Sequence, residues 1–169
     1  YHLKAGMQID KSRLDEIQLA TEKSQALDKA MTHLSAAMKT KKQIRDFLAK
    51  KGYTDAVCDY VIKRLEYYKL IDDEAYCRAY VNSVKGKGKR ALEVDLIKRG
   101  AEKSAIYMAL EDAEEDGEEA LRILRKYLRG KENTKENLYK GYKYLLSKGF
   151  SYDTAKTALD GFGGDNEDY

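Results

Sequence analysis

Apolar residues recur along this chain at the spacing of helices. The clearest set, between positions 55 and 65, has members one, three or four residues apart: Val57, Cys58, Val61, Ile62 and Leu65. This spacing places them on one face of a helix. No stretch alternates apolar and polar residues as a half-buried strand does, and the chain has no proline to interrupt a helix. The pattern predicts an all-α fold.

Three glycines, spaced 48 and 49 residues apart, mark a repeat. A base comes directly before each glycine, and a leucine comes four positions before it. A base is favourable beside the carbonyl end of a helix, and glycine adopts the left-handed conformation that closes a helix at little steric cost. We therefore predict that each glycine ends a helix and that each leucine is buried. The sets are Leu48, Lys51 and Gly52; Leu96, Arg99 and Gly100; and Leu145, Lys148 and Gly149.

A further helix is predicted before each leucine, over 26–38, 74–84 and 118–128. An amphipathic helix is also predicted after each glycine, so each unit has three helices in about 45 residues. This is typical of repeated helical modules, in which each unit contacts mainly its neighbours. The sequence therefore predicts an elongated, curved array of three repeated three-helix units.

The three repeats are expected to be flanked by a short segment at each end of the chain. The glycine-rich end of the chain, from residue 161, is expected to be frayed. Because the first residue is not Met, we expect the sequence to be a piece of a longer chain. The segments are an N-terminal remnant at 1–25, repeats at 26–71, 72–115 and 116–163, and an acidic tail at 164–169.

The sequence contains no recognisable catalytic or metal-binding constellation. His2 lies at the start of the chain, and His33 lies in a predicted helix without a suitably spaced carboxylate or cysteine. Two cysteines cannot build a disulfide framework, and Cys58 is expected to be a buried free thiol. No phosphate-loop motif occurs, and no apolar run is long enough for a membrane span. We expect a non-enzymatic protein of the reducing cytoplasm, without cofactor or metal.

The net charge is only +3, but the charges are segregated. Six bases lie in 39–51 and five in 122–131, whereas 111–119 carries seven acids and no base. Basic helices attract phosphates, although charge runs are also found on faces that only contact solvent.

The segment 83–93, SVKGKGKRALE, adds four bases and two glycines between two predicted helices. We expect an exposed, mobile link that contacts phosphates or an acidic partner, and the alternative is a plain flexible turn. With the basic helices, the candidate binding residues are Arg45, Arg78, Lys85, Lys87, Lys89, Arg90, Lys98, Arg99, Arg122, Arg125, Lys126 and Arg129.

The segment 67–100 resembles the centre of the RecX family, bacterial regulatory proteins of the RecA recombinase. It has a Leu-Ile-Asp-Asp turn, a helix with aromatic residues and a basic link with glycine, and the resemblance extends over 26–162. The chain departs from the family pattern at Lys39 to Lys42, where Arg-Ser is common, and at Gly141, where an apolar residue is expected. The matching residues are Leu70, Ile71, Asp72, Asp73, Tyr76, Tyr80, Val81, Gly88 and Leu96.

This resemblance implies a binding protein that lies along the groove of the RecA–DNA filament. There it would modulate, and mainly inhibit, ATP hydrolysis, strand exchange and coprotease activity, in DNA repair and the SOS response. The candidate basic residues would contact RecA, single-stranded or double-stranded DNA, or both, and we expect the protein to be a monomer.

Two other function classes stay open at this point. A direct DNA-binding protein of helix-turn-helix type would need a helix that presents Arg, Asn or Gln to base edges, but the helices after the glycines carry mainly small, acidic or apolar residues. An adaptor that binds only other proteins would fit the 14 tyrosines, since tyrosine is enriched at interfaces. Sedimentation with RecA filaments or with naked DNA separates the three classes.

Overall fold

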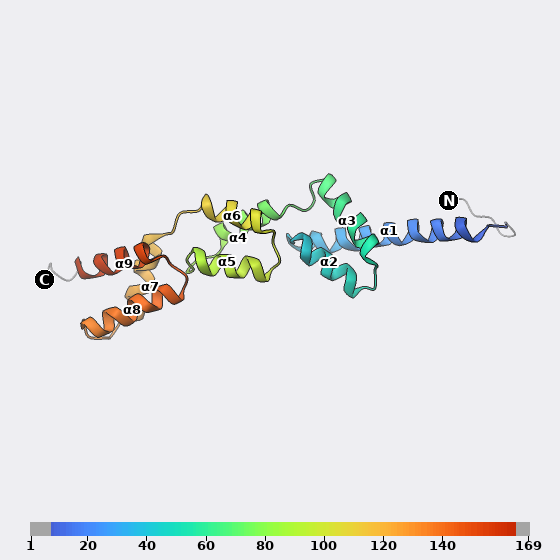
Figure 1. Ribbon diagram of the computed structural model, residues 1–169. Helices are drawn as coiled ribbons and strands as arrows, with labels where there is room; N and C mark the ends of the chain where they lie inside the picture. The colour runs from blue at the N-terminus through green and yellow to red at the C-terminus, as the bar shows by residue number, and fades with distance from the viewer. Residues whose placement is uncertain (1–7, 165–169) are drawn as a thin grey trace. The chain divides into compact units, whose positions relative to one another are not determined.

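The computed structural model describes residues 8–164, and within them the chain is all-α, as predicted (Figure 1). The described residues contain nine helices and no strand. The helices are α1 (Lys11–Ala36), α2 (Lys41–Lys50), α3 (Asp55–Tyr67), α4 (Asp73–Ser83), α5 (Lys89–Lys98), α6 (Lys103–Glu111), α7 (Gly117–Leu128), α8 (Lys135–Ser147) and α9 (Tyr152–Gly164). None of these helices combines the length and the apolar character that a membrane span requires.

The chain forms two compact units, one that ends at Asp73 and one that begins at Glu74. Helices α1, α2 and α3 form the first unit, which contains the first repeat. The second unit contains the second repeat, α4 to α6, and the third, α7 to α9. Each repeat has its own cluster of buried apolar residues, and these clusters include Leu48, Leu96 and Leu145 respectively. The predicted helical repeat is thus confirmed, while the elongated, curved shape stays a prediction.

The glycine that follows the second helix of each repeat has the predicted left-handed conformation. The φ angles are 89° at Gly52, 73° at Gly100 and 86° at Gly149. In the first repeat, the amide of Gly52 donates to the carbonyl of Ala49, and the amide of the next residue, Tyr53, donates to the carbonyl of Leu48. This pair of hydrogen bonds is the Schellman motif.

The same two hydrogen bonds occur after α5 and after α8. The repeated spacing has a physical cause: in each repeat the leucine carbonyl accepts a hydrogen bond that closes the helix, and the leucine side chain is fully buried. The residue after the glycine packs in or against the apolar cluster of its own repeat: Tyr53 and Ala101 are partly buried against theirs, and Phe150 is buried in the third. The prediction of three buried leucines at equivalent places is confirmed.

Helix α1 differs from the prediction because it begins at Lys11 rather than near residue 26 and ends at Ala36. Asp10 caps it by accepting a hydrogen bond from the amide of Arg13, at 2.7 Å. Only its second half is packed, with Ala26 and Ala30 buried against α2 and α3 (Figure 1). The first half has no buried residue, so it lies outside the packed core of the first repeat.

Helix α9 also extends beyond the predicted start of the frayed end, since it includes the glycines up to Gly164. The prediction of a frayed end is therefore wrong for residues 161–164, and its remaining part lies outside the described residues. Gly161 lies 3.6 Å, measured from an ideal Cβ, from the Leu121 side chain of α7. The contact with α7 therefore extends to the glycine-rich end of this helix.

Gly141, where the family pattern favours an apolar residue, is explained by close packing in the third repeat. It is buried in α8, and a Cβ at this position would lie 2.6 Å from Cδ1 of Leu124 in α7. Glycine allows the two helices to approach, and Leu124 occupies the volume that a side chain on α8 would otherwise fill.

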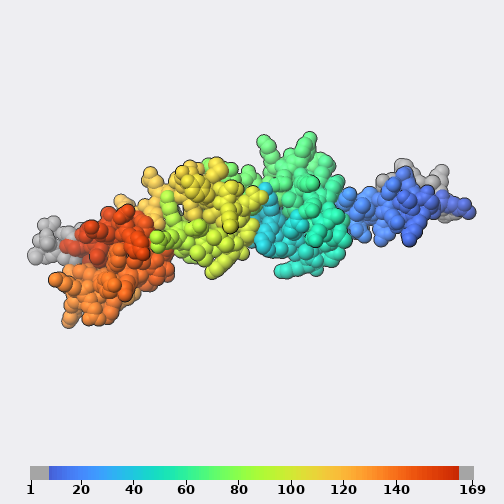
Figure 2. All heavy atoms as spheres, in the orientation of Figure 1, coloured from blue at the N-terminus to red at the C-terminus, as the bar shows by residue number. Residues whose placement is uncertain are grey.

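The second and third repeats are joined by backbone contact at Gly88. Its amide donates to the carbonyl of Lys148 at 3.0 Å, and the amide of Arg90 donates to the carbonyl of Gly149 at 3.2 Å. A Cβ on Gly88 would lie 2.2 Å from the Gly149 oxygen and from the Phe150 nitrogen, so only glycine fits. In Figure 2 the lime-green atoms near the start of α5 adjoin the orange and red atoms of the third repeat.

This contact corrects the prediction of an exposed, mobile link over 83–93. Lys85 is exposed, but Gly88 is buried and the chain at Gly88 and Arg90 is hydrogen bonded to the third repeat. The glycine therefore serves close packing rather than mobility. Sequence analysis identified the glycine but not its partner, which comes from a distant part of the chain.

Glu115 strengthens the same contact between the second and third repeats, which we call the joint, because its carboxylate binds the N-terminal ends of two helices. It accepts hydrogen bonds from the amide of Lys89 at 3.0 Å, the amide of Ser151 at 2.9 Å and the hydroxyl of Thr154 at 2.6 Å. Burial alone would raise the pKa of the Glu115 carboxyl, but these hydrogen bonds outweigh burial and hold its pKa below the ordinary value. The first unit has a related contact, since the Asp73 carboxylate accepts from the amide of Lys41 at the start of α2.

We expect Glu115→Gln to lower the free energy of unfolding of the second unit by about 1–3 kcal/mol at neutral pH, because hydrogen bonds to a charged acceptor are lost. The folded-state pKa lies below the unfolded value of about 4.3. The contribution is therefore present above that value and is lost as the pH falls through the folded-state pKa. Urea unfolding between about pH 6 and pH 3 should show the wild-type advantage shrinking toward the acid end. Glu114→Gln, at an exposed neighbour, is the control. Equal losses of unfolding free energy in the two variants would show that Glu115 does not stabilise the contact between the second and third repeats.

Candidate functional site

Two of the predicted binding arginines are neutralised by acids of their own repeat. Arg45 of α2 bonds to Asp59 of α3 and lies 3.8 Å from Asp55. Arg78 of α4 pairs with Glu74 at 2.8 Å and with Asp112 at 3.0 Å. These guanidinium groups stabilise helix pairs within their repeats, so they are less available to an external anion than their charge suggests.

Two more bases near the link are held by polar partners. Lys87 bonds to the carboxylate of Asp95, and this bond lowers the pKa of Asp95. The guanidinium of Arg99 donates to the hydroxyl of Tyr76 at 3.2 Å and lies over the ring of Tyr80, 4.5 Å from its centroid. Both groups are therefore positioned by the second repeat.

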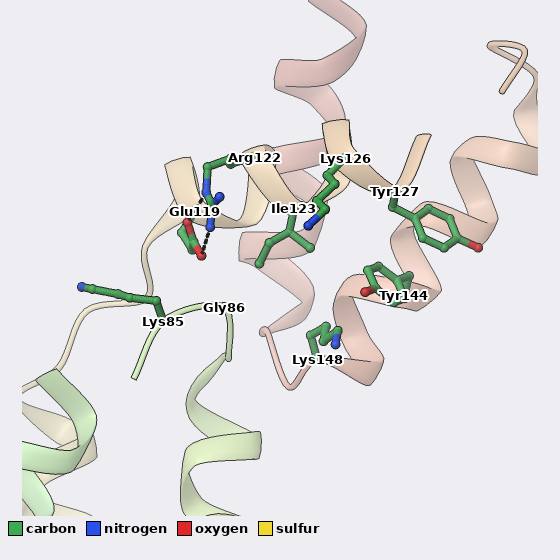
Figure 3. A pocket seen from close by; sticks show the side chains of 9 residues that line it. All are labelled: Lys85, Gly86, Glu119, Arg122, Ile123, Lys126, Tyr127, Tyr144 and Lys148. Carbon is green, nitrogen blue, oxygen red and sulfur yellow. Dashed lines mark hydrogen bonds and ion pairs between the residues drawn. The ribbon is translucent and has the colours of Figure 1, made fainter. Parts of the chain in front are cut away.

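A different arrangement occurs where the link meets the third repeat (Figure 3). A hollow of about 400 Å³ lies between the link, α7 and α8. Four basic side chains and one acid line it: Lys85 from the link, Arg122, Lys126 and Glu119 from α7, and Lys148 from the end of α8. We call this hollow, with these residues, the basic hollow.

Its charge is not balanced by the single acid. Glu119 accepts two hydrogen bonds from Arg122, at 2.6 and 2.7 Å, and these hold its pKa below the ordinary value. Within residues 8–164 no carboxylate forms a close ion pair with Lys85 or Lys126, although the charge of Lys85 also helps to lower the pKa of Glu119. The arrangement can therefore attract an anion, since free ammonium groups at a concave surface focus positive potential.

Two tyrosines form one end of the basic hollow. Tyr127 of α7 and Tyr144 of α8 stack with ring centroids 4.4 Å apart and planes 17° apart. The ammonium of Lys131 lies 3.4 Å from the Tyr127 centroid, and that of Lys148 lies 5.2 Å from the Tyr144 centroid. Aromatic faces next to cations suit ligands that carry both a flat ring and negative charge.

The remaining predicted residues lie outside the basic hollow. Lys89 binds Glu115 through its backbone, and Arg90 lies over the ring of Tyr152 at 5.3 Å. Lys98, Arg125 and Arg129 are exposed at the ends or outer faces of α5 and α7.

The structure thus brings together three of the predicted residues, Lys85, Arg122 and Lys126. Lys148 was not predicted as a binding residue, because its place before Gly149 is explained by the end of the helix. Tyr127 and Tyr144 were not predicted either. The alternation of bases and tyrosines at 125–131 and 139–148 is the one signal that could have indicated them.

No group of three or more metal-ligating side chains occurs within residues 8–164. Cys58 and Cys77 are both buried free thiols, as predicted for Cys58, and burial raises the pKa of Cys58. His33 stacks on Phe47 with ring centroids 4.1 Å apart.

Residues 26–65 match the family model described as the first three-helix domain of RecX. The chain is 33% identical to the regulatory protein RecX of Bacillus subtilis over 95% of its own length and 63% of that protein. It is 30% identical to that of Clostridium perfringens over 89% of its length and 74% of that protein. The chain spans a little under two thirds of the length of the Bacillus relatives.

Two solved structures have the same fold. A crystal structure of RecX from Lactobacillus salivarius aligns with a TM-score of 0.79 at 24% identity, covering 83% of this chain and 96% of that one. A crystal structure of a regulatory protein RecX aligns with a TM-score of 0.83 at 25% identity, covering 94% of this chain and 81% of that one. The repeated three-helix fold and the similarity to named relatives along most of the sequence lead to one conclusion: the chain belongs to the RecX family of regulatory proteins.

Proposed function

We propose that this protein is a non-enzymatic regulator that binds the RecA–DNA filament and mainly inhibits its ATP hydrolysis, strand exchange and coprotease activity. The observation that carries the proposal is the basic hollow, which four basic side chains from two repeats of a RecX-family chain line together with a single acid. A nucleoprotein filament offers a dense array of phosphates and acidic side chains, and several weak contacts to such an array add to a high affinity.

The joint at Gly88 supports this proposal by fixing the basic groups in space. Lys85 lies just before the backbone contact with Lys148 and Gly149, so the backbone that carries Lys85 is held close to the end of α8. A fixed set of charges loses little conformational entropy on binding. Direct readout of base edges is less well supported, because Arg45 and Arg78 are already paired with acids.

The proposal predicts the effect of removing the four bases of the link. The variant Lys85→Ala, Lys87→Ala, Lys89→Ala, Arg90→Ala should inhibit RecA ATPase less than wild type, since it removes Lys85 from the basic hollow and three neighbouring bases from the link and the start of α5. Its free energy of unfolding should fall by no more than about 1 kcal/mol, because the one ion pair among these side chains is partly exposed. The measurement is ATP hydrolysis by RecA on single-stranded DNA, with protein titrated at two salt concentrations.

Each lost phosphate contact should flatten the salt dependence by roughly one unit of slope. A quadruple alanine variant at the exposed residues Lys63, Lys103, Lys135 and Lys156 changes the net charge equally and serves as the control. If both variants inhibit like wild type with an unchanged salt slope, the link does not contact the filament. If wild type itself leaves RecA ATPase unchanged, the proposed function is wrong.

A further inference from the structure

The basic hollow has a composition that a phosphate-binding patch alone does not require. Besides its four bases and one acid, its lining includes Ile123, Tyr127 and Tyr144. Its volume of about 400 Å³ falls in the range of small-ligand sites. Figure 3 shows Lys126 and Lys148 reaching it from two helices, with the tyrosines at one end and the Arg122–Glu119 pair at the other.

The tyrosine stack is covered by lysine ammonium groups that a ligand can displace. Lys131 and Lys148 lie over the two rings, and neither ammonium has a carboxylate partner among the described residues. A cation over an exposed ring contributes only about 0.5–1 kcal/mol. An incoming phosphate can therefore draw the Lys148 ammonium away from Tyr144 and leave a ring face open.

A flat, anionic ligand would use both features at once. An unpaired nucleotide has a π-face that stacks on tyrosine and a phosphate that binds ammonium groups. An acidic side chain offers only the charge. A base pair inside a duplex cannot enter the hollow, because its faces are already stacked on neighbouring base pairs.

We propose that the basic hollow is a subsite for one unpaired nucleotide of a single strand, with the base on Tyr144 and the phosphate on Lys126 and Lys148. This inference deepens the proposed function and rests on it for its biological setting, since a recombinase filament contains single-stranded DNA. The binding itself requires only this chain and a single strand.

The test is fluorescence anisotropy with the full chain and a labelled oligothymidine of about 12 nucleotides. Wild type should bind this strand more tightly than a duplex of the same length. Tyr144→Leu should weaken single-strand binding by about 5- to 150-fold, the range for one stacked base, and should leave duplex binding unchanged. Lys126→Ala, an exposed residue, should weaken binding and flatten its salt dependence by roughly one unit.

The control is Tyr139→Leu, on the same helix. Tyr139 is 56% exposed and also carries a lysine over its ring, Lys143 at 4.6 Å, but it does not line the hollow. The Tyr139→Leu variant should bind the single strand as tightly as wild type does. Circular dichroism checks that each variant is folded, and Lys126→Ala keeps the test valid if Tyr144→Leu is unstable.

Several outcomes overturn the subsite. The first is that wild type binds the single strand and the duplex with equal affinity. The second is that Tyr144→Leu and Lys126→Ala both bind the strand as tightly as wild type does. The third is that a poly-glutamate peptide competes as effectively as unlabelled oligothymidine. If Tyr144→Leu and Lys126→Ala weaken the binding of oligouridine as much as that of oligothymidine, the subsite accepts an unpaired nucleotide with either ribose or deoxyribose. If wild type inhibits RecA ATPase without binding the free strand, the subsite fails and the proposed function stands. If it binds the strand as expected without affecting RecA, the proposed function fails alone.

Discussion

Gly149→Ala should lower the free energy of unfolding of the second unit by about 2–5 kcal/mol, from overpacking of about 1–3 kcal/mol and left-handed strain of about 1–2 kcal/mol. The φ angle of Gly149 is 86°, a conformation that costs energy for any residue with a Cβ. In addition, the new Cβ would lie 2.4 Å from the Ala91 nitrogen. Backbone atoms at that distance cannot move aside as a flexible side chain can, so the contact between the second and third repeats should be lost.

Gly52→Ala is a matched control for this prediction. Gly52 has nearly the same φ angle, 89°, at the same place in the repeat, but no atom lies within 4 Å of its ideal Cβ. It should therefore show only the strain of the left-handed conformation, about 1–2 kcal/mol. Urea unfolding and hydrogen exchange of both variants measure the difference. Equal destabilisation by the two substitutions would contradict the close contact at Gly149.

Leu96→Ala should destabilise the second repeat by about 2–5 kcal/mol, the cost of deleting a well-packed leucine. Leu96 is fully buried in α5 and lies in a cluster with Tyr76, Cys77 and Ile106. This cluster is separate from those of the other repeats, so few neighbouring side chains can move in to fill the cavity.

The control for Leu96→Ala lies on the same helix. Val94 is 47% exposed, so Val94→Ala should change the free energy of unfolding by about 0.5 kcal/mol or less. Chemical denaturation of both variants makes the comparison. A loss below about 1 kcal/mol for Leu96→Ala would mean that the second repeat lacks the packed core described here.

The parts of the fold that depend on local chemistry could be predicted from the sequence. The spacing of Leu48 and Gly52, repeated twice more, follows from one hydrogen-bonded helix end, and a local motif leaves a local signature. The start of α1 at Lys11 could not be predicted from apolar periodicity, because its first half buries no side chain.

The contact between Gly88 and Gly149 could not be predicted either. It joins residues far apart in the chain, and each glycine alone has a plausible local role as a turn or a helix end. Glu115 is similar, since its three hydrogen-bond donors come from α5 and from the start of α9. One acid within an acidic segment gives no sign of such partners.

For the site, the sequence identified where bases are concentrated but not which of them are free. Arg45 is neutralised by Asp59, and Lys87 is bound by Asp95. These pairings depend on the three-dimensional arrangement of the helices. The tyrosine stack at the basic hollow likewise forms only when α7 and α8 pack side by side.

The most direct test of the account is sedimentation of this protein with RecA filaments assembled on single-stranded DNA, compared with RecA alone and with naked DNA, over a salt series. We predict that the protein pellets with the filaments, that rising salt releases it progressively, and that the quadruple variant of the link pellets less than the control variant of equal charge. A protein that stays in the supernatant with filaments at low salt, or that binds naked DNA as tightly as it binds filaments, would contradict the account.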